Sequence, residues 1–120
     1  MSKDSLTELT LKLKDFAVRR DWEQFHSPKN LAMALTAECG ELLEHFQWLT
    51  EEQSQAVGGV KKTEVSHEMA DILIYLLRLA ERLDIDILKA ANEKMAINEQ
   101  RYPAQKVKGD ARRASEYGDD

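Results

Sequence analysis

Two pairs of acidic residues, about thirty residues apart, have the most suggestive spacing in this chain. Glu38 and Glu41 form the first pair, and Glu68 and Asp71 form the second, so that each pair has the spacing i, i+3. On an α-helix, this spacing places both side chains on one face. Apolar residues flank both pairs, which indicates that the acidic groups lie at the edge of buried helix surface.

If the two helices pack together, the four carboxylates converge and repel one another. Two charges about 4 Å apart repel by about 4 kcal/mol at an effective dielectric constant of about 20. A divalent cation removes this repulsion, and Mg²⁺ prefers oxygen ligands and often links protein carboxylates to phosphate groups. The sequence therefore predicts a metal site at these four carboxylates. The alternative is that both pairs are solvated faces of their helices.

Composition narrows the class of protein. The chain has 120 residues, 42% hydrophobic and 32% charged, which is typical of one soluble globular domain. Its net charge of −5 and the lack of a basic stripe argue against nucleic acid as a partner. No apolar run reaches the roughly 18 residues that a membrane helix needs, and the N-terminus does not resemble a signal peptide. A single cysteine, Cys39, allows no internal disulfide, so we expect a cytoplasmic protein.

Helical periodicity runs through most of the chain, and glycine and proline are scarce. The pattern predicts an all-α fold of the four-helix-bundle type. The expected helices cover residues 5–20, 28–48, 63–83 and 84–102, with a loop at 49–62. Ser5 with Glu8, Ser27, and Asp84 are the expected N-terminal caps of the first, second and fourth helices. We expect one domain at residues 1–104 and a flexible polar tail at residues 105–120.

Aromatic residues flank the second expected helix. Trp22 and His26 precede it, and Trp48 ends it. Bundle packing can bring Trp22 and Trp48 to one end of a cleft, where these side chains either wall a pocket for a flat ring or simply fill the core. On the fourth helix, Lys94, Asn98 and Arg101 fall at i, i+4 and i+7. This face either donates hydrogen bonds to phosphate oxygens or is a solvated surface.

Read together, these segments resemble the MazG-like nucleotide pyrophosphohydrolases, an all-α superfamily, and most of all their dCTP pyrophosphatase branch. The acidic signature Glu-x-x-Glu followed by Glu-x-x-Asp carries the resemblance. Further likeness lies in residues 20–26, Phe46-Gln47-Trp48, residues 71–76, and the segment from Lys94 to Ala104. The likeness covers roughly residues 8–104.

The resemblance implies a helical bundle whose active site is completed in a homodimer or homotetramer. It implies Mg²⁺-dependent hydrolysis of dCTP, or of 5-modified dCTP, to dCMP and pyrophosphate, with Mn²⁺ as a substitute metal. The resemblance implies that Glu38, Glu41, Glu68 and Asp71 bind the metal, and among them we expect Glu41 first, and Glu38 second, to be catalytic. The matching substrate-binding positions are Trp22, His26, Trp48, Tyr75, Lys94, Asn98, Arg101 and Tyr102. Water, activated by a carboxylate such as Glu41 or by the metal, attacks the α-phosphorus. We expect neither nucleic acid nor a membrane as a partner.

Two departures and several rival readings stay open. Ala37 precedes the first acidic pair, where the wider superfamily often has glutamate, and His45 lies one turn beyond Glu41 as a core-edge residue or an indirect metal contact. The nearest rival is the same chemistry with another nucleotide preference. Glu64 with His67 has the Glu-x-x-His spacing of di-iron carboxylate proteins, and a non-catalytic helical adaptor is a further alternative.

Overall fold

A computed structural model describes residues 4–112 and 114–116. This described part is all-helical and contains no strand, as the sequence predicts. Its helical segments are α1 (Ser5–Arg19), η1 (Glu23–Phe25), α2 (Pro28–Glu44), α3 (Glu51–Gln55), α4 (Gly59–Arg82), α5 (Ile87–Arg101), α6 (Ala104–Val107) and η2 (Ala114–Glu116). The chain divides into two compact units, residues 1–85 and 86–120, which are described separately.

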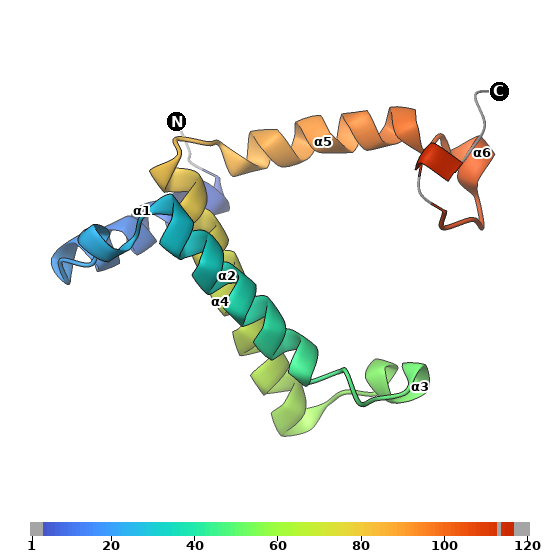
Figure 1. The fold of residues 1–120 in the computed structure, drawn as a ribbon, viewed down its shortest axis with the longest axis horizontal. Coiled ribbons are helices and arrows are strands. Elements are labelled where there is room, and N and C mark those ends of the chain that lie inside the picture. The colour runs from blue at the N-terminus through green and yellow to red at the C-terminus, as the bar shows by residue number, and fades with distance from the viewer. Residues whose placement is uncertain (1–3, 113, 117–120) are drawn as a thin grey trace. The chain divides into compact units, whose positions relative to one another are not determined.

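In the first unit, α2 and α4 pack side by side in opposite directions, and α1 packs against α4 (Figure 1). The fully buried apolar side chains are few: Ala17 of α1, Leu31 of α2, and Leu77 of α4 are at most 1% exposed. They come from the three helices that pack together in this unit. Helix α4 is not buried along its whole length, because Met69 on it is 58% exposed.

The helix starts follow local capping chemistry. Ser27 caps α2, with its hydroxyl accepting a hydrogen bond from the Asn30 amide and Pro28 at the first position, as predicted. The prediction of a Ser5–Glu8 capping box was wrong, since Asp4 caps α1 and accepts from the Thr7 amide at 2.7 Å.

Two helix ends share one backbone motif. After α4, the amides of Asp84 and Ile85 donate to the carbonyls of Glu81 and Ala80, and Asp84 has a φ of 55°. This is a Schellman motif, in which one residue adopts the left-handed conformation. The prediction that Asp84 caps the next helix was therefore wrong, because it closes α4, and Asp86 caps α5.

The same motif closes α1. Asp21 has a φ of 54°, and the amides of Asp21 and Trp22 donate to the carbonyls of Val18 and Ala17. The turn anchors Trp22 directly to the backbone of a buried residue of α1. It therefore fixes the start of the segment that contains Trp22 and His26.

The prediction of a loop at residues 49–62 was wrong both in its bounds and in its secondary structure. Helix α2 ends at Glu44 rather than at Trp48, and α4 already begins at Gly59, whose φ is 60°. Between them lies α3, which has a complete capping box formed by Thr50 and Gln53. This reciprocal pair satisfies amide groups at the start of a helix that is otherwise too short to be stable.

In the second unit, α5 ends at Arg101 and is capped by Tyr102, just before Pro103, as expected because proline cannot continue a helix. The segment expected to be a polar tail, residues 105–120, contains most of α6 and all of η2. Residues 113 and 117–120 of the predicted tail lie outside the described residues. Residues 1–3 of the predicted domain also lie outside them. Within the described residues, no helix has the length and hydrophobicity needed to cross a membrane.

Candidate active site

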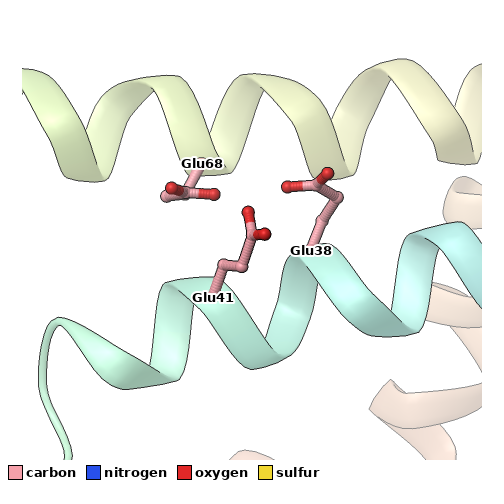
Figure 2. A group of neighbouring side chains, drawn as sticks. All are labelled: Glu38, Glu41 and Glu68. Carbon is pink, nitrogen blue, oxygen red and sulfur yellow. The ribbon is translucent and has the colours of Figure 1, made fainter.

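Three of the four predicted metal ligands converge between α2 and α4. Glu38 and Glu41 project from α2 towards α4, and Glu68 projects from α4 towards them (Figure 2). One carboxylate oxygen from each of the three lies within 4.8 Å of the others. Glu38 and Glu68 are half-buried, and Glu41 is exposed. The i, i+3 spacing on α2 and the antiparallel packing of α4 thus produce the convergence that the sequence predicts.

Like charge dominates the electrostatics of this cluster. The pKa of Glu38 is raised to about 7, first by burial, then by its hydrogen bond with Glu41 and by repulsion from Glu41, Asp71 and Glu68. No lysine or arginine forms an ion pair with Glu38, Glu41 or Glu68 among the residues that the structure describes. The mutual repulsion of these carboxylates is therefore not offset by a lysine or arginine within the described residues.

The unpaired oxygens of the cluster fit a metal ion. Oε2 of Glu38 and Oε2 of Glu68 are buried and have no hydrogen-bond partner within the described chain. An unsatisfied buried carboxylate oxygen costs free energy, and a hard divalent cation accepts such oxygens as ligands. Asp71 is half-buried and close enough to raise the pKa of Glu38, so it can complete a four-carboxylate set.

His45 lies beside the cluster at the end of α2. Its Nε2 is 3.7 Å from Oε1 of Glu68, and its Nδ1 is 4.0 Å from Oε2 of Glu64. The sequence left His45 as either a core-edge residue or an indirect metal contact. The structure places it against a candidate metal ligand, with its side chain 16% exposed.

A pocket of about 210 Å³ opens between α1, the η1 segment and α4. Three of the predicted substrate-binding residues, Trp22, His26 and Tyr75, line it, together with Asp71. Phe16 and Trp22 meet edge to face with ring centroids 5.7 Å apart, and Trp22 and His26 do so at 6.3 Å. Because Asp71 also acts on Glu38, it links the aromatic pocket to the carboxylate cluster.

A buried arginine, which sequence reasoning missed, forms the base of this pocket region. Arg78 is 2% exposed and lines the pocket. Its guanidinium lies 3.0 Å from Glu81, 3.6 Å from Glu23 and 3.4 Å from Nδ1 of His26. The signal was present in the sequence, where Arg78 interrupts the apolar run from Ile72 to Ala80. A charge that is buried among ionic partners is costly to leave unpaired.

Other predicted residues lie elsewhere. Trp48 is 86% exposed and does not line the pocket. It follows α2 whereas Trp22 precedes it, and a helix of 17 residues separates its ends by about 25 Å. The expectation that one chain brings both tryptophans to one end of a cleft was therefore wrong. Lys94, Asn98 and Arg101 lie on α5, and Tyr102 caps it, all in the second unit.

Comparison with known proteins places these features in a family. Residues 33–119 match the model of the MazG-like family. The chain is 46% identical over 99 residues to "dCTP pyrophosphatase 1" of Mus musculus and 43% identical over 104 residues to that of Homo sapiens. These matches cover 81% and 85% of this chain, but the chain spans only 58% and 61% of the two relatives.

A solved structure gives the same result for the fold. The crystal structure of a pyrophosphatase from Archaeoglobus fulgidus matches with a TM-score of 0.80 and 39% sequence identity. The match covers 86% of this chain and 96% of the archaeal chain. The all-helical fold, the converging acidic residues and the match over most of the sequence agree: this chain belongs to the MazG-like family.

Proposed function

We propose that this protein is a metal-dependent nucleoside triphosphate pyrophosphohydrolase that converts dCTP, or a 5-modified dCTP, and water into dCMP and pyrophosphate. One observation carries the proposal: a cluster of uncompensated carboxylates adjoins an aromatic pocket, because Asp71 lines that pocket and its charge raises the pKa of Glu38 in the cluster. The names of the two mammalian relatives and of the archaeal structure support the same chemistry. Nucleotide-pool house-cleaning in the cytoplasm is the corresponding cellular role.

Glu38, Glu41, Glu68 and Asp71 would hold the metal, for which Mg²⁺ is the first choice and Mn²⁺ a substitute. When bound, Mg²⁺ supplies positive charge for the triphosphate and for the attacking water. Glu38 and Glu68 suit direct ligation because each has a buried oxygen without a partner. Glu41 is exposed, so water reaches its carboxylate most easily. We therefore place Glu41 first, and Glu38 second, as the group that accepts the proton of the attacking water.

The aromatic pocket would hold the base and the sugar. At about 210 Å³, it is smaller than the roughly 300–1,000 Å³ of a site that encloses a whole drug-sized ligand. It therefore suits the base, with the phosphates extending towards the carboxylates. Trp22 offers a face for stacking, which contributes about 1–3 kcal/mol per base. Tyr75 follows Asp71 by one helical turn and lines the same pocket, where its ring can lie against the deoxyribose.

Four residues of the second unit would bind the phosphate chain. Lys94, Asn98 and Arg101 share one face of α5, and Tyr102 follows at its end, where the guanidinium of Arg101 lies 5.6 Å from the Tyr102 ring. Lysine and arginine supply the positive charge that departing pyrophosphate requires. Their role in this chain is taken from the resemblance to the family.

A homodimer or homotetramer would complete the site. Large apolar side chains on α2 and α4 stay exposed in the single chain, among them Met33 at 57%, Leu43 at 57% and Met69 at 58%. Exposed apolar surface of this extent is typical of an interface. Trp48, exposed at one end of α2, would then contribute to the site of a partner subunit.

Incubation with a panel of deoxy- and ribonucleoside triphosphates tests the proposal. We expect dCTP to be hydrolysed best, with release of dCMP and pyrophosphate in the presence of Mg²⁺ and no hydrolysis in excess EDTA. A preference for another nucleotide would favour the same chemistry on another substrate. Release of orthophosphate, or activity that survives EDTA, would contradict the proposal.

A further inference from the structure

The contact between Arg78 and His26 determines which nitrogen of the histidine carries its proton. Nε and Nη2 of Arg78 are each 3.4 Å from Nδ1 of His26, at the long end of hydrogen-bonding distance. A guanidinium has donors and no acceptor, so Nδ1 must be the acceptor. A neutral imidazole that accepts at Nδ1 carries its hydrogen on Nε2. The arginine therefore favours one tautomer.

Burial and the positive charges around His26 keep its imidazole neutral. Its pKa is lowered, first by burial and then by the positive charges of Arg78 and Arg82, against a smaller opposing effect of Glu23. Glu23 lies 3.6 Å from the guanidinium of Arg78 and 3.8 Å from that of Arg82, so both positive charges have a nearby counter-charge. A protonated His26 would direct an N–H group at a guanidinium, which repels it.

Nε2 of His26 is left free for a ligand. His26 lines the aromatic pocket with Trp22 and Tyr75, and in the described range its Nε2 has no hydrogen-bond partner. The pocket is lined mainly by apolar and aromatic side chains, with Asp71 and Arg78 as its charged residues. A donor without a partner in such a pocket is a group that fixes the orientation of a ligand.

We propose that Arg78 is a positioning residue that fixes His26 as the Nε2–H tautomer, so that His26 donates a hydrogen bond to the carbonyl oxygen of a pyrimidine base. The identity of the ligand rests on the proposed function, whereas the tautomer rests on the contact alone. Arg78 acts through His26 and need not touch the substrate. Without Arg78, the imidazole is free to take either tautomer, and the donor is lost from part of the population.

NMR of the ¹⁵N-labelled full chain tests the tautomer directly. Two-bond ¹H–¹⁵N correlations distinguish the two neutral forms and the protonated form, and the His26→Gln variant assigns the signals. We expect the wild type at neutral pH to show Nε2–H, and Arg78→Met to show a mixture. Lys14→Met removes a neighbouring ion pair with Glu81 and should keep the wild-type form. Nδ1–H or a protonated ring in the wild type overturns the role of Arg78, even if Arg78→Met does not fold.

Binding of dCMP, measured by calorimetry, tests the donor. Glutamine can place an N–H near the position of Nε2, whereas phenylalanine keeps a ring of similar shape without a donor. Loss of one hydrogen bond should weaken dCMP binding to His26→Phe by about tenfold. His26→Gln should bind within about threefold of wild type, because the donor is kept. Equal weakening in both variants overturns the donor.

The outcomes separate this inference from the proposed function. A wild-type protein that shows Nε2–H but does not bind dCMP would overturn the assigned ligand and the nucleotide specificity. A wild-type protein that binds dCMP but shows Nδ1–H would overturn the positioning role alone. Retention of a single Nε2–H form in folded Arg78→Met would also overturn that role, because the tautomer would then not depend on the arginine.

Discussion

Two groups of charged side chains lie along α4, and they differ in how their charge is balanced. The carboxylate cluster, formed by Glu38, Glu41 and Glu68, has only negative charge and orphaned oxygens. The arginine cluster, formed by Arg78 with Glu23 and Glu81, has its charges paired within the protein, although Oε1 of Glu23 also lacks a hydrogen-bond partner in the described residues. About ten residues, or about 15 Å of helix, separate them. Both contain buried polar atoms, so charge balance rather than burial distinguishes a site that awaits a cation from one that holds the fold.

The residues between the clusters connect them. Glu68, Asp71, Tyr75 and Arg78 fall at i, i+3, i+7 and i+10 of α4, which is one face of the helix. The aromatic pocket contacts the last three. One helix face therefore begins at the uncompensated carboxylate of Glu68, passes the aromatic pocket, and ends at the paired guanidinium of Arg78. This order suits a nucleotide with phosphates at one end and a base at the other.

The largest effect should come from the carboxylate side. Glu41→Gln and Asp71→Asn should each lower dCTP turnover at least about a hundredfold, the scale for loss of one electrostatic element of a site. The initial rate with Mg²⁺ measures this effect. Both variants should keep the wild-type circular dichroism, since each relieves repulsion. Near-wild-type turnover in both variants would show that the carboxylate cluster is not the catalytic site.

Unlike the carboxylate variants, which should keep their fold, Arg78→Met should lower the free energy of unfolding. Breaking a buried ion pair leaves uncompensated charge and costs about 3–5 kcal/mol. Because Glu23 and Glu81 are partly exposed, we expect a loss nearer about 2–3 kcal/mol, measured by urea unfolding. Lys14→Met, which breaks a more exposed pair with Glu81, should cost less than about 1 kcal/mol. Equal losses would show that Arg78 contributes no more than a surface charge.

The stability of the metal-free protein should depend on pH through Glu38. Its pKa rises from 4.5 to about 7 in the folded chain, so the folded state holds more protons between these values. The free energy of unfolding should therefore fall as pH rises from 4.5 through 7. Melting temperatures in EDTA measure this fall, and Mg²⁺ should abolish it.

Glu38→Gln is the matched control for that pH dependence. The variant cannot titrate at this position, so its melting temperature in EDTA should change less over the same pH range. A wild-type curve that rises with pH would show that the cluster is already compensated. The two clusters would then no longer differ in whether their charges are paired.

The smallest effect concerns the residue between the clusters. If Tyr75 lies against deoxyribose, a ribose hydroxyl loses its water partners there, which costs about 1–3 kcal/mol. We expect dCTP to be preferred over CTP by about tenfold or more, judged by kcat/KM. Tyr75→Ala should narrow this preference while Mg²⁺ affinity changes little. Equal hydrolysis of both nucleotides by the wild type would contradict the sugar contact.

Much of this protein was determined by sequence alone, because the relevant interactions are local. Helical period places Glu38 with Glu41 and Glu68 with Asp71 on shared faces. The Ser27 cap likewise depends only on residues within one turn. For the same reason, the all-helical class and the acidic signature were predictable without a structure.

The tertiary structure decided which faces meet, because pairing between helices depends on how whole side-chain surfaces pack. Only packing brings Arg78 to His26, 52 residues away in sequence, and leaves Trp48 outside the pocket. The tertiary structure also decided where some helices end. Asp84 has the side chain of an N-cap, yet its backbone adopts the left-handed conformation that closes α4. An aspartate suits either position, and the path of the chain after α4 selects one.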